Sequence, residues 1–258
     1  MRSWQRIFSL ALVCVAFTGF VTPAAVAATR APRTPTPGIY PPGSKIFGHT
    51  YAQLSASWWR WSFQTPLHGP KGQIAQAIAP FTGKVNCRYA QKGDVWFIAP
   101  PLNAATSPVN RTCTVPQGKA LFFPVYDAWA DNLNYPGQPP TTYTSKQLRQ
   151  QAAGYLANAS SLTASLDGTI VADLSDLSSP YRTKAPLWHY TLPADSWLNA
   201  YFNQTWPAGT TTPPPGAAAD GVYVAVKPLS AGTHTLTFGA TGSGLDENVT
   251  YTIKVPAT

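Results

Sequence analysis

The sequence predicts a mainly β fold, an antiparallel β-sandwich or jelly-roll-like domain with one or two packed α-helices. Three observations lead to this prediction. Many short runs of β-branched and aromatic residues are separated by turns rich in Gly and Pro. In the last of these runs, Tyr251, Ile253 and Val255 alternate with polar residues, as they do in a half-buried strand. Two capping-box patterns mark the starts of helices that can pack on the sheets.

Each expected helix begins at a Thr that is followed three residues later by a Gln. In a capping box these two side chains satisfy backbone N–H groups at the helix start. Thr50 and Gln53 form the first such pattern, and Pro66 ends the helix that follows. Thr144 and Gln147 form the second pattern. Apolar residues recur at helical spacing after both, so each helix is expected to have an apolar face.

The clearest β-hairpin in the sequence lies at residues 161–172. Two alternating runs flank Asp167-Gly168, a dipeptide that two-residue hairpin turns favour. The remaining strands are expected at residues 94–98, 119–126, 187–192, 222–227, 233–238 and 248–255.

The chain is expected to be exported. Residues 1–27 contain a positively charged start, an apolar run and a small-residue cleavage site, the three parts of a secretory signal peptide. An uncleaved anchor is the alternative, although the run is short for a membrane span. A Pro/Thr-rich tether is expected at 28–44 and a single β-sandwich-like domain at 45–258. No later segment is apolar enough to cross a membrane, so the mature chain is expected to be secreted, extracellular or periplasmic.

Cys87 and Cys113 are the cysteines left after Cys14 leaves with the signal peptide. An even pair in an exported chain predicts a disulfide. A zinc site is not expected, because the pair lacks CxxC spacing. Neither another metal site nor a cofactor is expected from the sequence.

The charge distribution is one-sided in the first half of the mature chain. The formal charge of the whole chain is +8, and the loss of Arg2 and Arg6 leaves +6. No Asp or Glu occurs before Asp94. This pattern favours an anionic partner, such as an acidic polysaccharide, a cell-wall polymer or a membrane surface, with simple solubility as the alternative. Nucleic acid is not expected, because no binding motif accompanies the charge. The basic residues of this stretch are Arg30, Arg33, Lys45, Arg60, Lys71, Lys84, Arg88 and Lys92.

Seven segments spread over most of the mature chain form a specific pattern. They are 57–61 (SWWRW), Cys87, 93–98 (GDVWFI), 111–116 (RTCTVP), 118–124 (GKALFFP), 166–168 (LDG) and 228–235 (PLSAGTHT). Together they resemble an uncharacterised family of exported bacterial proteins. The resemblance implies a bacterial source and one continuous domain. It carries no activity and no catalytic residues to this chain.

The candidate ligand-binding residues lie in the aromatic segment of the first helix. If Trp58 and Trp61 face the core, Trp59 lies on a second face, where it is expected to be exposed with Arg60 beside it. An exposed indole could stack on a sugar ring. The alternative is a wide aromatic contact between the helix and a sheet, because Trp is often buried without being functional.

The candidate catalytic residues are two carboxylates and two histidines. Asp127 and Asp131 follow a strong strand, with Trp129 between them as a further candidate for sugar stacking. Such a pair could act as acid and base in glycoside hydrolysis, and a capped turn or a surface pair is the alternative. His189 and His234 lie in expected strands and could serve as general bases, with a structural role as the alternative.

Several enzyme classes are disfavoured because the sequence contains no GxSxG, HExxH, P-loop or Rossmann glycine pattern. The leading hypothesis is an extracellular domain that binds a glycan or cell-wall polymer without turnover. A polysaccharide-active hydrolase or lyase is the first alternative, and a structural or adhesive surface protein is the second.

Overall fold

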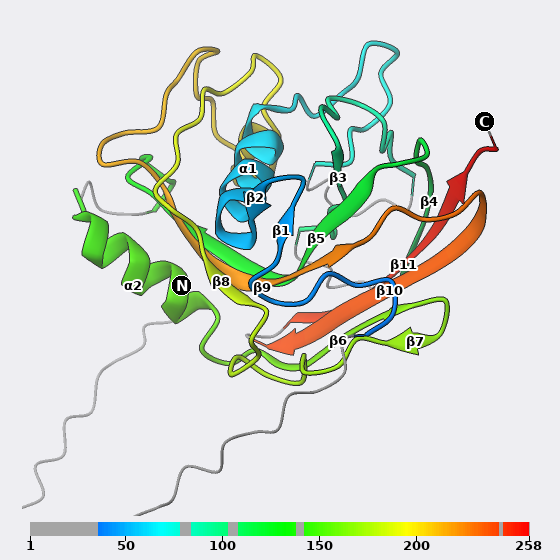
Figure 1. Ribbon diagram of the computed structural model, residues 1–258. Coiled ribbons are helices and arrows are strands. Elements are labelled where there is room, and N and C mark those ends of the chain that lie inside the picture. Colours follow the sequence, from blue (N-terminus) through cyan, green and yellow to red (C-terminus); the bar gives the residue numbers. More distant parts are fainter. Residues whose placement is uncertain (1–35, 78–83, 103–107, 138–141, 243–244, 258) are drawn as a thin grey trace, which may run out of the picture. The chain divides into compact units, whose positions relative to one another are not determined.

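The computed structural model describes residues 36–77, 84–102, 108–137, 142–242 and 245–257 (Figure 1). The expected signal peptide and the first part of the expected tether lie outside the described residues. The described residues belong to one compact unit. Among the described residues, no helix has the length and apolar character needed to span a membrane.

Two sheets form the body of this unit (Figure 1). The first has the strand order β3-β5-β9-β8, with β3 at Val95–Phe97, β5 at Ala120–Ala130, β9 at Ala218–Val226 and β8 at Arg182–Lys184. The second has the order β4-β11-β10-β6-β7, with β4 at Val109–Thr114, β11 at Leu245–Val255, β10 at Gly232–Gly242, β6 at Ser160–Leu166 and β7 at Thr169–Ile170. A small ladder joins β1 (Lys45–Ile46) to β2 (His49–Thr50).

The expectation of purely antiparallel sheets is wrong. β3 pairs with β5, and β4 with β11, in parallel. The chain order explains the first of these pairs. After β3 the chain crosses to the second sheet as β4 and then returns as β5, so β3 and β5 are not joined by a hairpin and can run in the same direction. The fold is therefore mainly β, as expected, but with mixed sheets.

Both expected helices are confirmed. α1 spans Tyr51–Gln64 and α2 spans Ser145–Tyr155, and each begins with a complete capping box. At α1 the Gln53 N–H donates to Thr50 Oγ1 (3.2 Å), while the Thr50 N–H donates to Gln53 Oε1 (2.9 Å). α1 packs on one face of the first sheet, and α2 packs against small residues at the ends of β5 and β9 (Figure 1). A third short helix, α3 (Trp197–Phe202), was not expected from the sequence.

The predicted hairpin is confirmed as β6 and β7. Asp167 and Gly168 form its turn, with φ values of 49° and 79°, the left-handed conformation that this turn requires. The strand expected at 187–192 does not form. That segment makes only isolated bridges, from Trp188 to Ala217 and from Thr191 to Thr211.

Residues 36–44 pack on the domain, although their composition favours a tether without a core. Ile39 is 1% exposed and forms an isolated bridge with Val226. The Tyr40 N–H donates to the Ala225 carbonyl (2.9 Å). This segment is bonded to the end of β9 in the first sheet, so apolar residues of a Pro-rich stretch are held against the core.

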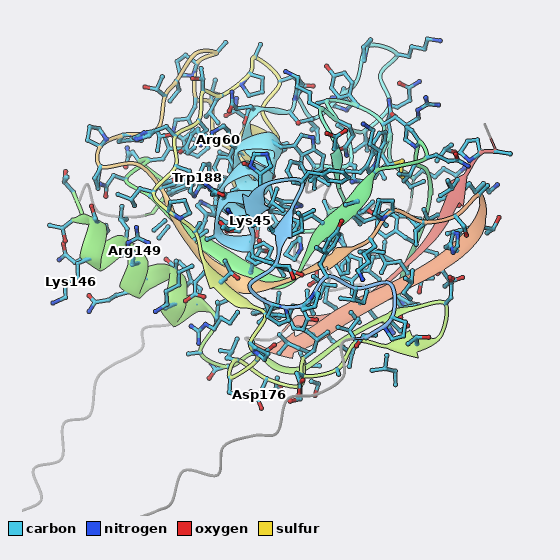
Figure 2. The ribbon with its side chains drawn as sticks, in the orientation of Figure 1. Lys45, Arg60, Lys146, Arg149, Asp176 and Trp188 are labelled. Carbon is cyan, nitrogen blue, oxygen red and sulfur yellow. A yellow bond between two sulfur atoms is a disulfide. The ribbon has the colours of Figure 1, made fainter. Side chains whose placement is uncertain are left out.

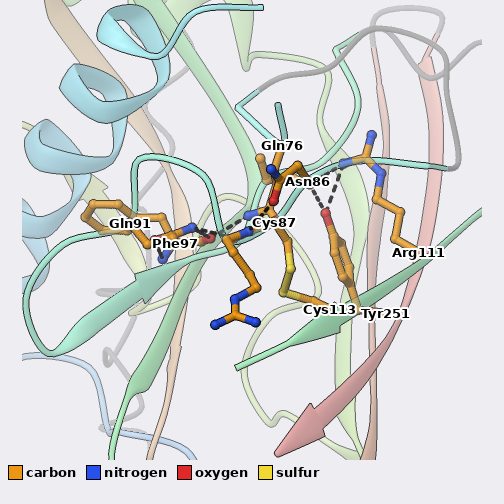
Figure 3. Close-up of a disulfide and its surroundings, with 10 residues drawn as sticks. Gln76, Asn86, Cys87, Gln91, Phe97, Arg111, Cys113 and Tyr251 are labelled. Atoms are coloured by element: carbon orange, nitrogen blue, oxygen red, sulfur yellow. Dashed lines mark hydrogen bonds between the residues drawn. A yellow bond between two sulfur atoms is a disulfide. The ribbon is translucent and has the colours of Figure 1, made fainter. Parts of the chain in front are cut away.

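The expected Cys87–Cys113 disulfide is present and joins β4 to the loop before β3 (Figure 3). The two Cα atoms lie 5.7 Å apart, within the usual range for a disulfide. Both cysteines are buried, and Cys113 follows the β4 residue Arg111, which hydrogen-bonds to Tyr251 of β11. The disulfide thus fixes a long loop to the second sheet.

Loss of the disulfide is expected to lower the free energy of unfolding by about 3–4 kcal/mol, because the bond closes a long loop in the unfolded chain. The bridge spans a sequence separation of 26 residues. The measurement is urea denaturation of the mature protein and of a double Cys87→Ser/Cys113→Ser variant. Dithiothreitol should shift the wild-type midpoint toward that of the variant and leave the variant unchanged. Identical midpoints for the oxidised protein and the variant would contradict the expectation.

Candidate functional site

A layer of aromatic side chains fills the space between α1 and the first sheet. The Trp59 ring lies 5.0 Å from Trp129 of β5 and 5.8 Å from Phe63, measured between ring centroids. It stacks at 17° on Trp188, which comes from the segment before β9. Trp58 is also fully buried, and its ring meets Trp59 edge-on.

The expectation that Trp59 is exposed is wrong, because its side chain is 1% exposed. The sheet covers one side of α1, and the segment that carries Trp188 covers another. A helix enclosed in this way buries two faces, so inward and outward positions cannot be assigned from a single apolar stripe. Trp129 belongs to the same layer and donates from Nε1 to the Tyr135 hydroxyl (3.2 Å). The Trp59 indole offers no open face for stacking on a sugar, and Trp129 is half-buried against it.

A chain of hydrogen bonds connects the aromatic layer to Asp127. Trp59 Nε1 donates to the Tyr223 hydroxyl (3.0 Å), and that hydroxyl donates to Asp127 Oδ2 (3.0 Å). Burial raises the pKa of Asp127 to about 8, although the hydrogen bond from Tyr223 opposes this shift.

Asp127 lies opposite Gly221 in the β5–β9 ladder, and a Cβ atom at Gly221 would lie 2.4 Å from Asp127 Cβ. The carboxylate therefore needs a glycine beside it.

Glu247 on β11 interacts electrostatically with Asp127 and was not expected from the sequence. Burial and then the charge of Asp127 raise its pKa to about 8, and the charge of Arg111 acts in the opposite direction. Arg111 is 3% exposed and donates from Nη1 to the Ala99 carbonyl and to the Tyr251 hydroxyl (Figure 3). The signal for Glu247 was present in the β11 alternation, because residues 247, 249 and 251 share one face of the strand.

Asp131 is a buried and well-satisfied carboxylate. It accepts hydrogen bonds from the Tyr190 hydroxyl (2.9 Å), the Tyr135 hydroxyl (3.2 Å) and the Leu133 N–H (2.9 Å). Burial raises its pKa, and these three hydrogen bonds oppose the shift. The arrangement ties the end of β5 to the segment that carries Tyr190.

Asp127 and Asp131 lie at the end of β5 and just after it, with Trp129 between them. Each accepts hydrogen bonds from tyrosine hydroxyls, Asp127 from Tyr223 and Asp131 from Tyr190 and Tyr135. These bonds give both carboxyl groups a place in the packing of the domain.

His234 lies at the start of β10 and is linked to the turn of the β6–β7 hairpin. Its Nδ1 lies 2.7 Å from Asp167 Oδ2, and its Nε2 lies 3.1 Å from the Ser230 carbonyl oxygen. The hydrogen bond to Asp167 raises the pKa of His234. Asp167 also accepts from the Thr235 N–H (2.7 Å). These contacts give His234 a structural role at the hairpin, with both ring nitrogens engaged.

His189 lines one shallow pocket of about 200 Å³, and Arg60 lies beside it without lining it. Arg60 Nε donates to the His189 carbonyl (3.2 Å), and Gln64 lies one turn further along the exposed side of α1. Figure 2 labels Arg60 on α1 and Trp188 in the neighbouring segment. The His189 ring lies over Gly216, where a Cβ atom would be 2.9 Å from Cε1. The pocket is lined by Gln64, His189, Tyr190, Thr191, Thr211 and Thr212.

The residues that line the pocket have polar side chains, and none of them is a carboxylate. They offer an amide, an imidazole and the hydroxyls of Thr191 and Thr211. The Thr212 hydroxyl is bonded to the Tyr190 backbone, and the Tyr190 hydroxyl donates to Asp131. In the part of the chain that the structure describes, no group of three or more His, Cys, Asp or Glu side chains is arranged to hold a metal ion. The pocket can therefore donate and accept hydrogen bonds, but it has no carboxyl group to act as a general acid.

Comparison with known proteins gave no match to any family model, curated protein or solved structure. The resemblance of the sequence segments to a family of exported bacterial proteins stays a prediction.

Proposed function

We propose that this chain is an exported protein that binds an extracellular glycan or cell-wall polymer, without turnover, at the pocket that His189 and Gln64 line beside Arg60. The pocket itself carries the proposal. Its amide and hydroxyl groups suit the hydroxyls of a sugar, and its openness to solvent suits a polymer that passes over the surface. Two facing β-sheets also occur in lectin domains, which supports the proposal only by analogy of fold.

The positions of the carboxylates favour binding over turnover. Asp131 is held by three hydrogen bonds beneath the surface, and Asp127 lies in the layer under α1. Neither lines the pocket. A hydrolase would need an acid in contact with the glycosidic oxygen.

A polysaccharide-active enzyme is the second candidate, and one observation supports it. Asp127 has its pKa raised to about 8 by burial, so this carboxyl is protonated at neutral pH, as a general acid must be. For this function, a substrate would have to contact Asp127, which is half-buried on β5.

The test is retention of the mature protein on an immobilised polysaccharide panel, with parallel assays for new reducing ends and unsaturated uronates. We expect retention without product. Thr211→Phe should fill the pocket and abolish retention, because Thr211 is exposed in the lining. Thr169→Phe, at an exposed position on the distant strand β7, is the matched control and should bind as the wild type does. New product would favour the enzyme, and equal retention of both variants would exclude this pocket as the binding site.

A further inference from the structure

We infer that the pocket recognises an anionic group of its polymer, a sugar carboxylate or a phosphodiester, through the guanidinium of Arg60. The inference rests on the proposed function and names the chemical class of the ligand. It is carried by the hydrogen bonding of Arg60, by the composition of the pocket and by the charge of the surrounding chain.

Arg60 presents unused donors beside the pocket. A guanidinium has five N–H donors in a planar fork, which matches the oxygens of carboxylate and phosphate groups. Within the described residues, the side chain of Arg60 makes a single hydrogen bond, from Nε to the His189 carbonyl. That bond holds the side chain beside the segment that carries His189 and leaves both Nη groups available. A guanidinium fork can bind an oxyanion through two parallel bonds.

No acidic side chain competes for this fork. The pocket lining contains no Asp or Glu, and Arg60 forms no ion pair within the part of the chain that the structure describes. The chain from residue 36 to residue 93 also has no acid. An approaching anion therefore meets a positive charge that is not paired with any carboxylate of the described residues.

The end of α1 acts in the opposite direction, because a helix C-terminus carries about half a negative charge. Two of its carbonyl groups are already occupied by donors. Trp61 O accepts from the Thr65 N–H and hydroxyl, and Ser62 O accepts from Trp197 Nε1. These bonds reduce the partial negative charge that the helix end exposes, whereas Arg60 carries a full positive charge beside the pocket. The positive charge is the larger of the two, so the pocket favours an anion.

The experiment compares polygalacturonate, its carboxyl-reduced galactan and poly(glycerol phosphate) as ligands for the mature protein. We expect one or both anionic polymers to bind at least about tenfold more tightly than the reduced polymer, and high salt to weaken that binding. Arg60→Gln should lower the affinity for the anionic polymer about tenfold, the loss that follows when one charge-assisted hydrogen bond is removed. Arg60→Lys keeps the charge without the fork, so its affinity should lie between those of the wild type and Arg60→Gln.

Arg149→Gln is the matched control. Arg149 also donates to a backbone carbonyl, that of Ala185 (2.9 Å), but it lies on α2, away from Arg60 (Figure 2). Its substitution removes the same charge and the same kind of bond, and should leave binding unchanged. Urea denaturation of each variant establishes that it is folded. Tighter binding of polygalacturonate than of poly(glycerol phosphate) by the wild type would identify the recognised group as a carboxylate. The opposite preference would identify it as a phosphodiester.

Equal binding of polygalacturonate and its reduced form, unchanged by Arg60→Gln, would overturn the inference and leave the glycan-binding function standing. An equal loss in Arg60→Gln and Arg149→Gln would also overturn it, because net charge alone would then explain binding. Failure of all neutral and anionic polymers to bind would remove both the inference and the proposed function.

Discussion

Trp59→Ala is expected to lower the free energy of unfolding by about 3–5 kcal/mol, the usual cost of emptying a large buried aromatic site. The indole is 1% exposed and contacts aromatic rings from α1, β5 and the segment before β9. The substitution also removes the donor to the Tyr223 hydroxyl, which lies in a buried chain of hydrogen bonds. Urea denaturation followed by circular dichroism measures the loss. Trp58→Ala should cost a similar amount, because Trp58 is equally buried.

Two variants separate packing from other effects of the substitution. Trp59→Phe keeps an aromatic ring and loses the N–H donor, so it should cost less than Trp59→Ala. Tyr155→Ala removes an aromatic ring that is 57% exposed at the end of α2, and it should change stability by no more than about 0.5 kcal/mol. If Trp59→Ala were as stable as Tyr155→Ala, the aromatic layer would not contribute to the core as the structure indicates.

Local signals predicted the local parts of the fold. The capping boxes at Thr50 and Thr144, and the Asp167-Gly168 turn, act over three or four residues and need no partner from elsewhere in the chain. The disulfide was predicted because only two mature cysteines exist to form it. The parallel strand β4 was missed because its sequence is mostly polar and its partner β11 lies at the other end of the chain.

The candidate site depends on contacts between distant segments, so only part of it could be predicted. Arg60 and His189 were selected as candidates separately, and the structure brings them together because Arg60 bonds to the backbone of a segment 129 residues away. Gln64 and Thr211, which complete the lining, carry no local signal. Trp59 was assigned to the wrong environment for the same reason, because Trp188 covers it from a distant part of the sequence.

Stability is expected to decrease as the pH rises from about 5 to about 8, because two carboxyl groups bind protons more tightly in the folded chain. The pKa of Asp127 rises from 3.8 to about 8 through burial, against the hydrogen bond from Tyr223. The pKa of Glu247 rises from 4.5 to about 8 through burial and the charge of Asp127, against Arg111. The stabilisation that comes from tighter proton binding in the folded chain is fully present below pH 4. It is lost as the pH rises toward 8, where the two carboxyl groups of the folded chain ionise.

The size of this effect follows from the width of the pH window. Each pH unit over which one such group is protonated only in the folded state changes the free energy of unfolding by about 1.4 kcal/mol. Between pH 5 and pH 8 a single group therefore accounts for about 4 kcal/mol. The charges of Asp127 and Glu247 interact, so the two contributions belong to the pair and do not simply add.

Asp127→Asn and Glu247→Gln should each flatten the dependence of the urea midpoint on pH, because each removes one of the titrating groups while keeping its size. Asn at position 127 can still accept the hydrogen bond from the Tyr223 hydroxyl. Asp246→Asn is the matched control, since Asp246 is the exposed neighbour of Glu247 on β11, and it should keep the full wild-type slope. A wild-type protein as stable at pH 8 as at pH 5, or a slope that Asp127→Asn leaves intact, would show that these carboxyl groups are ionised in the folded chain. In that case Asp127 would not be protonated at neutral pH and could not act as a general acid.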